Sequence, residues 1–199
     1  MSHVVVFHSA LGLRRGVKDF AEQIRKTGHS VVMLDLYGGE VFDNYEAGGS
    51  KWAELGIPKI MQMAQAFCAD LAGDIVFAGF SNGAALAELM AATHPSAKGC
   101  LLMHGALPLE MLQLKIWPKN VPVQLHYNVN DPFRKPEYDV AFENTVQSSG
   151  SQFKEYLYEG NTHLFSDKSL PDYNEVAAQL MIERAVQFID KTLSHPPLG

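Results

Sequence analysis

Six short apolar runs alternate with longer amphipathic stretches along the chain. The runs cover residues 4–7, 31–36, 75–80, 100–103, 121–127 and 153–158. They are continuous and rich in β-branched or aromatic residues, which is typical of strands buried on both faces of a parallel sheet. Helical patterns cover residues 16–27, 60–72, 82–93, 137–148 and 173–193. Strands that alternate with helices predict an α/β fold of three layers, αβα, around a mostly parallel sheet of about six to seven strands.

The composition is that of an ordinary globular protein. Of the 199 residues, 47% are hydrophobic and 19% are charged, and no repeat interrupts the pattern, so we expect a single domain over residues 1–199. The two cysteines, Cys68 and Cys100, cannot build a disulfide framework. A net charge of −6 leaves no basic field for a nucleic-acid partner.

The first residues bear on location. The segment MSHVVVFHSALG has no positively charged lead, and its apolar run at residues 4–7 is too short for a signal core or a membrane span. We therefore expect a cytoplasmic protein that binds neither membrane nor nucleic acid and exists as a monomer or a homodimer.

The segment GFSNG, residues 79–83, joins the third apolar run to the helical stretch that follows it. In this strand–turn–helix setting the GxSxG pattern predicts a nucleophile elbow, a sharp turn that projects the Ser81 hydroxyl above the sheet. The flanking glycines let backbone segments approach without a Cβ clash. The alternative is that Ser81 is only the N-cap of the helix, the commonest role of serine at such a place.

Two later residues supply partners for this serine. Asp131 and His163 each lie in a loop directly after an apolar run. A serine hydroxyl needs a base within hydrogen-bond reach and a carboxylate that orients the base. Taken alone, Asp131 equally fits an Asp-Pro turn, and His163 fits a surface histidine. Because the order Ser81, Asp131, His163 is that of α/β-hydrolases, the three together favour a catalytic triad.

A serine hydrolase also needs two backbone N–H groups to hold the oxyanion. The amide of Asn82, directly after the serine, is one candidate. The loop after the first run offers the second, which we place on Ala10 with Leu11 as the near alternative. Ser9 in the same loop could instead cap the residues that follow it.

Substrate-pocket residues are harder to assign. An apolar wall with few polar groups suits a small ester, and several side chains lie in or near strand-end loops. These candidates are Leu11, Tyr37, Glu40, Phe42, Trp52, Leu107 and Phe165. The alternative for each residue is that its side chain packs the loop onto the core, and we favour this alternative over a role in the pocket. His104 and His126 also lie at strand ends but lack the spacing of zinc ligands, so we expect structural roles for them, no metal site and no cofactor.

The segments VVVFHSALG, VVMLDLYGG, VFAGFSNGAALA, VQLHYNVNDPF and YEGNTHLF together resemble the dienelactone hydrolase family over nearly the whole chain. The resemblance implies a minimal α/β-hydrolase fold without a cap domain, and hydrolysis of an ester or lactone through an acyl-enzyme. Ser81 stands where the family's cysteine enzymes carry their nucleophile, and Ser9 where they carry a glutamate. After His163 the chain offers Asp167, where they carry an arginine for the substrate carboxylate. If Asp167 faces the pocket, a neutral or cationic acyl group would suit the site better than dienelactone.

The sequence thus predicts a hydrolase of small carboxylic esters or lactones that acts through Ser81, His163 and Asp131. Two alternatives stay open. The same triad can serve an acyltransferase, a thioesterase or a peptidase, and a chain of this fold can be a non-catalytic ligand-binding module.

Overall fold

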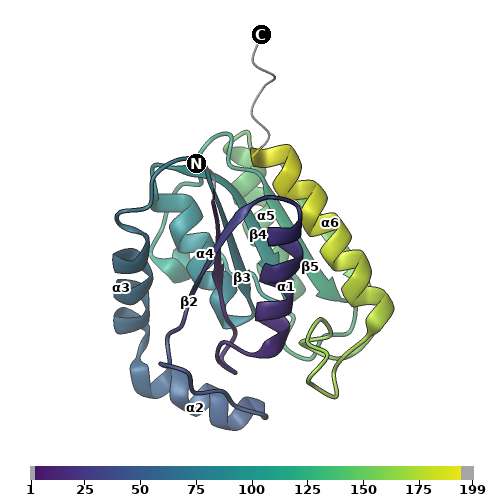
Figure 1. The fold of residues 1–199 in the computed structure, drawn as a ribbon. Helices are drawn as coiled ribbons and strands as arrows, with labels where there is room; N and C mark the ends of the chain where they lie inside the picture. Colours follow the sequence, from purple (N-terminus) through teal and green to yellow (C-terminus); the bar gives the residue numbers. More distant parts are fainter. Residues whose placement is uncertain (1–2, 194–199) are drawn as a thin grey trace.

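The computed structural model describes residues 3–193, in which a parallel sheet lies between two layers of helices (Figure 1). Within these residues the sheet has six strands in the order β2-β1-β3-β4-β5-β6. The strands are β1 (His3–Phe7), β2 (Ser30–Leu34), β3 (Ile75–Phe80), β4 (Ala97–Met103), β5 (Val123–Asn128) and β6 (Phe153–Tyr158). All neighbouring pairs are parallel, so every strand ends at the same edge of the sheet. This confirms the predicted α/β fold.

The five predicted helices are present, with ends shifted by a few residues. They are α1 (Arg15–Lys26), α3 (Ile57–Cys68), α4 (Asn82–Thr93), α5 (Pro136–Ser148) and α6 (Glu175–Leu193). Two further elements were not predicted, α2 (Tyr45–Leu55) and the short 3₁₀ helix η1 (Leu109–Leu112). None of the helices within residues 3–193 is long and apolar enough to cross a membrane.

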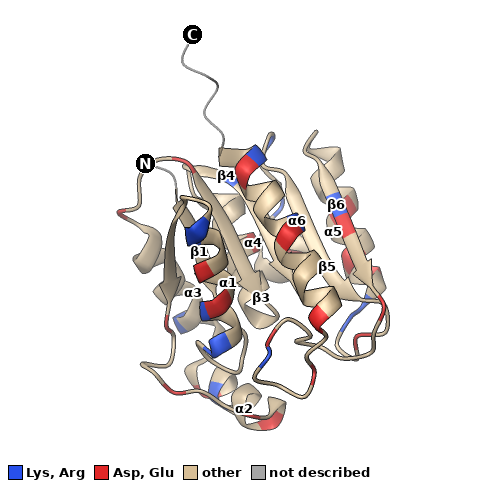
Figure 2. Cartoon of the chain, turned by 45° about the vertical axis from the view of Figure 1, so that its right-hand side comes forward, with Lys and Arg blue, Asp and Glu red and all other residues tan. Residues whose placement is uncertain are grey.

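Side chains of each strand alternate between two apolar cores. Val4 and Val6 of β1 pack with α1 and α6, whereas Val5 and Phe7 face the core beneath α3, α4 and α5. In Figure 1, α1 and α6 lie side by side on one face of the sheet. The ribbons of β1, β3 and β5 carry no Lys, Arg, Asp or Glu, and the charges lie mainly on helices and loops (Figure 2). This distribution is expected for a sheet covered on both faces.

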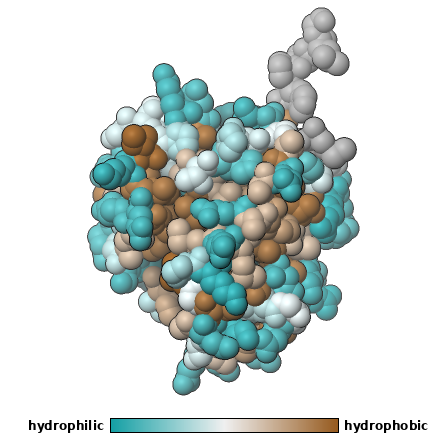
Figure 3. Space-filling model, turned by 90° about the vertical axis from the view of Figure 1, so that its left-hand side faces the viewer, coloured by the Kyte–Doolittle hydropathy of each residue, from teal (hydrophilic) through white to brown (hydrophobic). Residues whose placement is uncertain are grey.

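The helix α3 shows how one layer is fixed to the sheet. Its residues Ile60, Ala64 and Cys68 recur every fourth position and are buried. Figure 3 looks onto the side of the molecule that carries α3, where hydrophobic groups are interspersed with hydrophilic ones. One stripe of α3 therefore packs on the core while the rest meets solvent.

The sheet order places a binding region at one edge. The strands β2 and β3 lie on opposite sides of β1, and open α/β sheets bind ligands beyond the carboxyl ends of the strands at such a switch point. The helix α2 lies beyond this edge, outside both helix layers (Figure 1). A Cβ on its Gly48 would meet the carbonyl oxygen of Ala10 at 2.6 Å, so α2 packs directly on the loop after β1. No cap domain is inserted among the described residues.

Candidate active site

Ser81 occupies a sharp turn between β3 and α4. Its φ is +51°, a left-handed conformation that residues other than glycine rarely adopt. A Cβ on Gly79 would clash with the carbonyl oxygen of Gly83, and a Cβ on Gly83 would lie 2.5 Å from the carbonyl oxygen of Phe7. The structure therefore has the strand–turn–helix junction that the sequence predicted, and both glycines are needed for the close approach.

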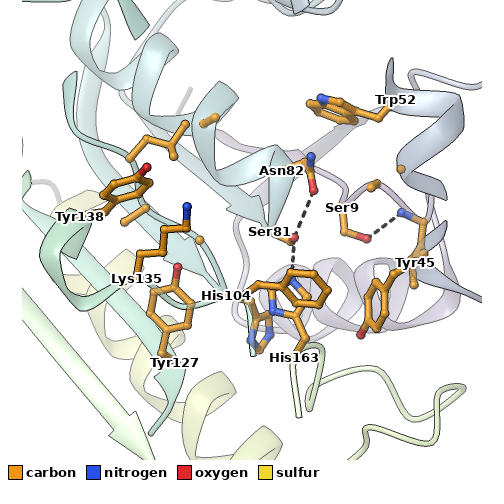
Figure 4. A pocket seen from close by; sticks show the side chains of 18 of the residues that line it. Ser9, Tyr45, Trp52, Ser81, Asn82, His104, Tyr127, Lys135, Tyr138 and His163 are labelled. Carbon is orange, nitrogen blue, oxygen red and sulfur yellow. Dashed lines mark hydrogen bonds between the residues drawn. The ribbon is translucent and has the colours of Figure 1, made fainter. Parts of the chain in front are cut away.

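The three side chains predicted as a triad form a chain of contacts, with His163 between Ser81 and Asp131. His163 Nε2 is 2.7 Å from Ser81 Oγ, and His163 Nδ1 is 2.8 Å from Asp131 Oδ2. Figure 4 shows the Ser81–His163 contact and a longer one, 3.3 Å, from Ser81 Oγ to the side chain of Asn82. Because an ionised carboxylate can only accept, the geometry assigns a proton to Nδ1 and leaves Nε2 free to accept the serine proton.

Backbone contacts fix the two loops that carry the acid and the base. Asp131 Oδ1 accepts a hydrogen bond from the amide of Phe133 at 2.8 Å. At the end of β5, Asn128 Nδ2 donates to the carbonyl oxygen of Thr162 at 2.8 Å. The loop after β5 is thereby tied to the loop after β6.

Three rings surround the imidazole of His163. The ring centroids of Phe133, Tyr45 and His104 lie 4.7, 5.6 and 5.9 Å from it. Burial lowers the pKa of His104 well below its ordinary value, and the neighbouring imidazoles act in the same direction. His104 is therefore neutral beside His163. Its Nε2 lies 2.9 Å from Ser166 Oγ, which fits the structural role expected for it.

Two backbone amides next to Ser81 lack a protein acceptor. Among the hydrogen bonds of residues 3–193, neither the amide of Ala10 nor that of Asn82 is a donor, and both residues line the cavity beside Ser81. The amide of Leu11, in contrast, donates to Ser9 Oγ at 3.2 Å. This difference favours Ala10 over Leu11 as the second donor to an oxyanion.

A cavity of about 540 Å³ opens beside Ser81. Figure 4 shows Trp52 on one side of it and Tyr127, Lys135 and Tyr138 on the other. The remaining lining residues are mostly apolar and include Ala85, Ala106, Leu107, Met111, Ile57 and Phe133. The cavity is therefore largely apolar, with polar groups near the serine and on the wall that carries Lys135.

Some of the expected pocket residues do not line this cavity. Those that do are Leu11, Trp52 and Leu107, and those that do not are Tyr37, Glu40, Phe42 and Phe165. Tyr37 is buried under the loop after β1, where its hydroxyl donates to the carbonyl oxygen of Ala10 at 3.0 Å. Glu40 is exposed and Phe165 is fully buried in the core. The structure therefore does not place Tyr37, Glu40 or Phe165 in the cavity lining: Tyr37 and Phe165 pack inward, and Glu40 faces solvent.

Asp167 is also remote from the cavity lining. It is buried, with Oδ2 3.2 Å from Nε of Arg14 and Oδ1 2.6 Å from Oγ of Ser169. No Asp or Glu is among the residues that line the cavity, and Lys135 is the one Lys or Arg there. Asp167 therefore does not line the cavity, so its charge gives no reason to expect a preference for neutral or cationic acyl groups.

The sequence had not singled out Tyr45, Phe133 or Lys135. A signal existed for the last two, because both lie in the loop that carries Asp131. Tyr45 had no such signal, because its place depends on α2, which the pattern did not predict.

The fold and the site define the class of protein. A parallel sheet that carries a serine elbow after β3, with an acid and a histidine in the loops after β5 and β6, is the arrangement of α/β-hydrolases. The sequence matches the dienelactone hydrolase family over residues 1–193, and the chain belongs to this family. Membership supports a hydrolase function. A comparison with curated protein sequences finds no match.

Solved structures share the fold at low sequence identity. A dienelactone hydrolase-like promiscuous phosphotriesterase from metagenomic libraries superposes with a TM-score of 0.79 at 19% identity, covering 98% of this chain and 87% of the other. A putative dienelactone hydrolase from Klebsiella pneumoniae gives 0.74 at 16% identity, with 95% and 86% covered. The mouse alpha/beta hydrolase domain-containing protein 10 gives 0.68 at 16%, with 95% and 90% covered.

Proposed function

We propose that the protein hydrolyses small carboxylic esters or lactones through an acyl-enzyme on Ser81. The observation that carries the proposal is the continuous contact from Asp131 through His163 to Ser81, at 2.8 and 2.7 Å. Membership of the dienelactone hydrolase family supports the same class of reaction.

In the proposed mechanism, His163 Nε2 accepts the hydroxyl proton while Ser81 Oγ attacks the carbonyl carbon. The amides of Ala10 and Asn82 stabilise the oxyanion of the tetrahedral intermediate. His163 then gives the proton to the leaving oxygen as the C–O bond breaks, which forms the acyl-enzyme. A water molecule then attacks the acyl carbon while His163 takes one of its protons. His163 returns this proton to Ser81 Oγ as the bond between the acyl carbon and Oγ breaks and the acid leaves. Asp131 holds the imidazole in the required tautomer.

The cavity supports small substrates with an apolar part. Its volume of about 540 Å³ is within the usual range for small-molecule sites. Trp52, Leu107 and Met111 offer apolar contact, whereas Asn82 and His163 place polar groups at the serine. An ester with a short alkyl or aryl group fits this distribution.

Replacing the nucleophile tests the proposal. Ser81→Ala removes the attacking oxygen but leaves the turn in place, so kcat on p-nitrophenyl acetate and butyrate should fall roughly 10⁴- to 10⁶-fold. Ser148→Ala is the matched control, because Ser148 is an exposed serine on α5 that is not among the residues lining the cavity. Circular dichroism and thermal unfolding would verify that both variants fold. Hydrolysis by Ser81→Ala at the rate of the control would contradict the proposal.

A further inference from the structure

The carboxylate of Asp172 binds the backbone on which His163 is mounted. Asp172 Oδ2 accepts hydrogen bonds from the amide of His163 at 3.0 Å and from that of Leu164 at 3.3 Å. The carbonyl oxygen of Asp172 accepts a third, from Thr162 Oγ1 at 2.8 Å. One residue thus holds three consecutive positions centred on the histidine.

These contacts are important because His163 lies outside regular secondary structure. The segment from the end of β6 to the start of α6 is a loop, residues 159–174, with no ladder or helix to hold it. The ring must nevertheless keep Nε2 at Ser81 and Nδ1 at Asp131. In such a loop, the position of the imidazole depends on side-chain contacts that fix its backbone.

The hydroxyl of Tyr45 binds the same carboxylate oxygen. It donates to Asp172 Oδ2 at 2.7 Å, the shortest of the three contacts to that atom. Burial, then the hydrogen bond to Asp172, raises the pKa of Tyr45 above its ordinary value, so the hydroxyl keeps its proton and remains a donor at neutral pH. The ring of Tyr45 also packs edge-on against His163 and lines the cavity (Figure 4).

Tyr45 is the first residue of α2, so the contact joins two parts of the site. The same helix contributes Gly49 and Trp52 to the cavity wall. The hydroxyl of Tyr45 therefore links the substrate wall to the loop of the base, with the Asp172 carboxylate between them.

We infer that Asp172 and Tyr45 are positioning residues for His163: Asp172 holds the backbone of the base, and the Tyr45 hydroxyl fixes Asp172 against α2. This inference rests on the proposed function of His163 as general base. Neither residue gives or takes a proton in the reaction. Both act by keeping Nε2 within reach of Ser81 Oγ, and small displacements of a reacting group cost large factors in rate.

The test compares Tyr45→Phe, Asp172→Asn and the double variant, with Tyr173→Phe as matched control. Tyr45→Phe keeps the ring and removes only the donor, so kcat should fall roughly tenfold with KM little changed, as expected for a lost hydrogen bond to a charged acceptor. The double variant should be no slower than Asp172→Asn alone, because the hydroxyl acts only through Asp172. Tyr173 is a neighbouring, partly exposed tyrosine whose replacement should leave kcat unchanged. If the double variant loses in kcat the product of the two single-variant factors, the proposed link through Asp172 is overturned.

A second measurement does not depend on turnover. In protein labelled with nitrogen-15 histidine, the Nδ1 proton that His163 donates to Asp131 should exchange slowly with water in the wild type and faster in Tyr45→Phe. Tyr173→Phe should match the wild type. If the wild type hydrolyses no ester, the proposed function fails, while this exchange still decides the positioning role. Exchange in Tyr45→Phe equal to that of the control would overturn the inference.

Discussion

Arg14 joins two loops at the edge of the candidate site. Its Nε contacts the buried carboxylate of Asp167 at 3.2 Å, and its Nη2 contacts Ser169 Oγ at 3.0 Å. Its Nη1 binds the carbonyl oxygen of Phe42. Nη1 of Arg14 also pairs with the exposed Asp43 at 2.8 Å, so Arg14 would keep one charged partner without Asp167. The Asp167 side chain is only 8% exposed, so solvent cannot compensate its charge if Arg14 is removed.

We predict that Arg14→Met lowers the free energy of unfolding by about 3–5 kcal/mol, because it leaves Asp167 buried without its partner. Urea unfolding at neutral pH measures the change. The neighbouring Arg15 is the control, since its ion pair with Asp19 is exposed and Arg15→Met should cost less than about 1 kcal/mol. Equal losses in the two variants would show that the Arg14–Asp167 pair is not what holds these loops.

At the scale of single residues, the positions of residues at strand ends allowed the candidate triad to be predicted, but only part of the cavity lining. Ser81, Asp131 and His163 could be placed together because parallel strands end at one edge of the sheet. The orientation of a side chain inside a loop could not be predicted, because it depends on contacts distant in sequence. Asp167 illustrates this, since its partner Arg14 is 153 positions away.

At the scale of elements, the close packing of α4 on β1 shapes the elbow. A Cβ on Gly83 would meet the carbonyl oxygens of Phe7 and His8. Backbone carbonyls at the end of a strand that is paired on both sides cannot move aside as a flexible side chain would.

We therefore predict that Gly83→Ala destabilises the protein by about 3 kcal/mol or more through overpacking. Gly49→Ala is the control, because a Cβ there has no neighbour within 4 Å and alanine favours the helix α2 by about 0.5–1 kcal/mol. Thermal unfolding of the two variants should shift in opposite directions. A Gly83→Ala variant as stable as the wild type would show that α4 can move away from β1.

The helix α2 could not be predicted from the pattern of apolar positions. The sequence YEAGGSKWAEL contains two glycines and few apolar positions, so it lacks a clear helical period. The helix forms because Asn44 caps it, accepting from the amide of Ala47 at 2.8 Å, and because Gly48 fits against Ala10. The packing of Gly48 on Ala10 joins residues distant in sequence, so no local pattern indicates it.

At the scale of the whole molecule, a buried histidine makes stability depend on pH. His126 of β5 is fully buried, with Nδ1 2.8 Å from the hydroxyl of Tyr158 and Nε2 2.9 Å from Gln124 Nε2. Burial, then the nearby charge of Arg184, lowers the pKa of His126 to about 3. The folded state therefore keeps this imidazole neutral at pH values where the unfolded chain protonates it.

The sign of the effect follows from this difference in proton binding. Between the ordinary pKa of about 6.5 and the folded value of about 3, the unfolded chain binds one more proton. The titration of His126 should therefore lower the free energy of unfolding by about 1.4 kcal/mol per pH unit as the pH drops below about 6. Asp139, whose pKa burial raises to about 6, acts in the opposite direction over part of the range.

A difference measurement isolates the contribution of His126. Urea unfolding of the wild type and of His126→Gln at pH 7.5, 6.0 and 5.0 should show the wild type losing stability more steeply in acid, because Asp139 contributes equally to both. Parallel pH curves would contradict the assigned neutral state of His126.

The overall architecture was the part most accessible from the sequence. Continuous β-branched runs specify strands covered on both faces, and their alternation with amphipathic stretches specifies helices on each side. The order of strands in the sheet is not encoded by any local pattern. It arises from packing across the whole sheet, and it places the loop that carries Ala10 beside the loop that carries Ser81.

The proposed function requires Ser81 to be a nucleophile that His163 activates. Incubation with a fluorophosphonate, followed by intact-mass measurement and peptide mapping, tests this role. We predict a single adduct on the peptide that contains Ser81, no adduct in Ser81→Ala, and much slower labelling in His163→Ala. An unlabelled wild type, or equal labelling of wild type and Ser81→Ala, would contradict the claim.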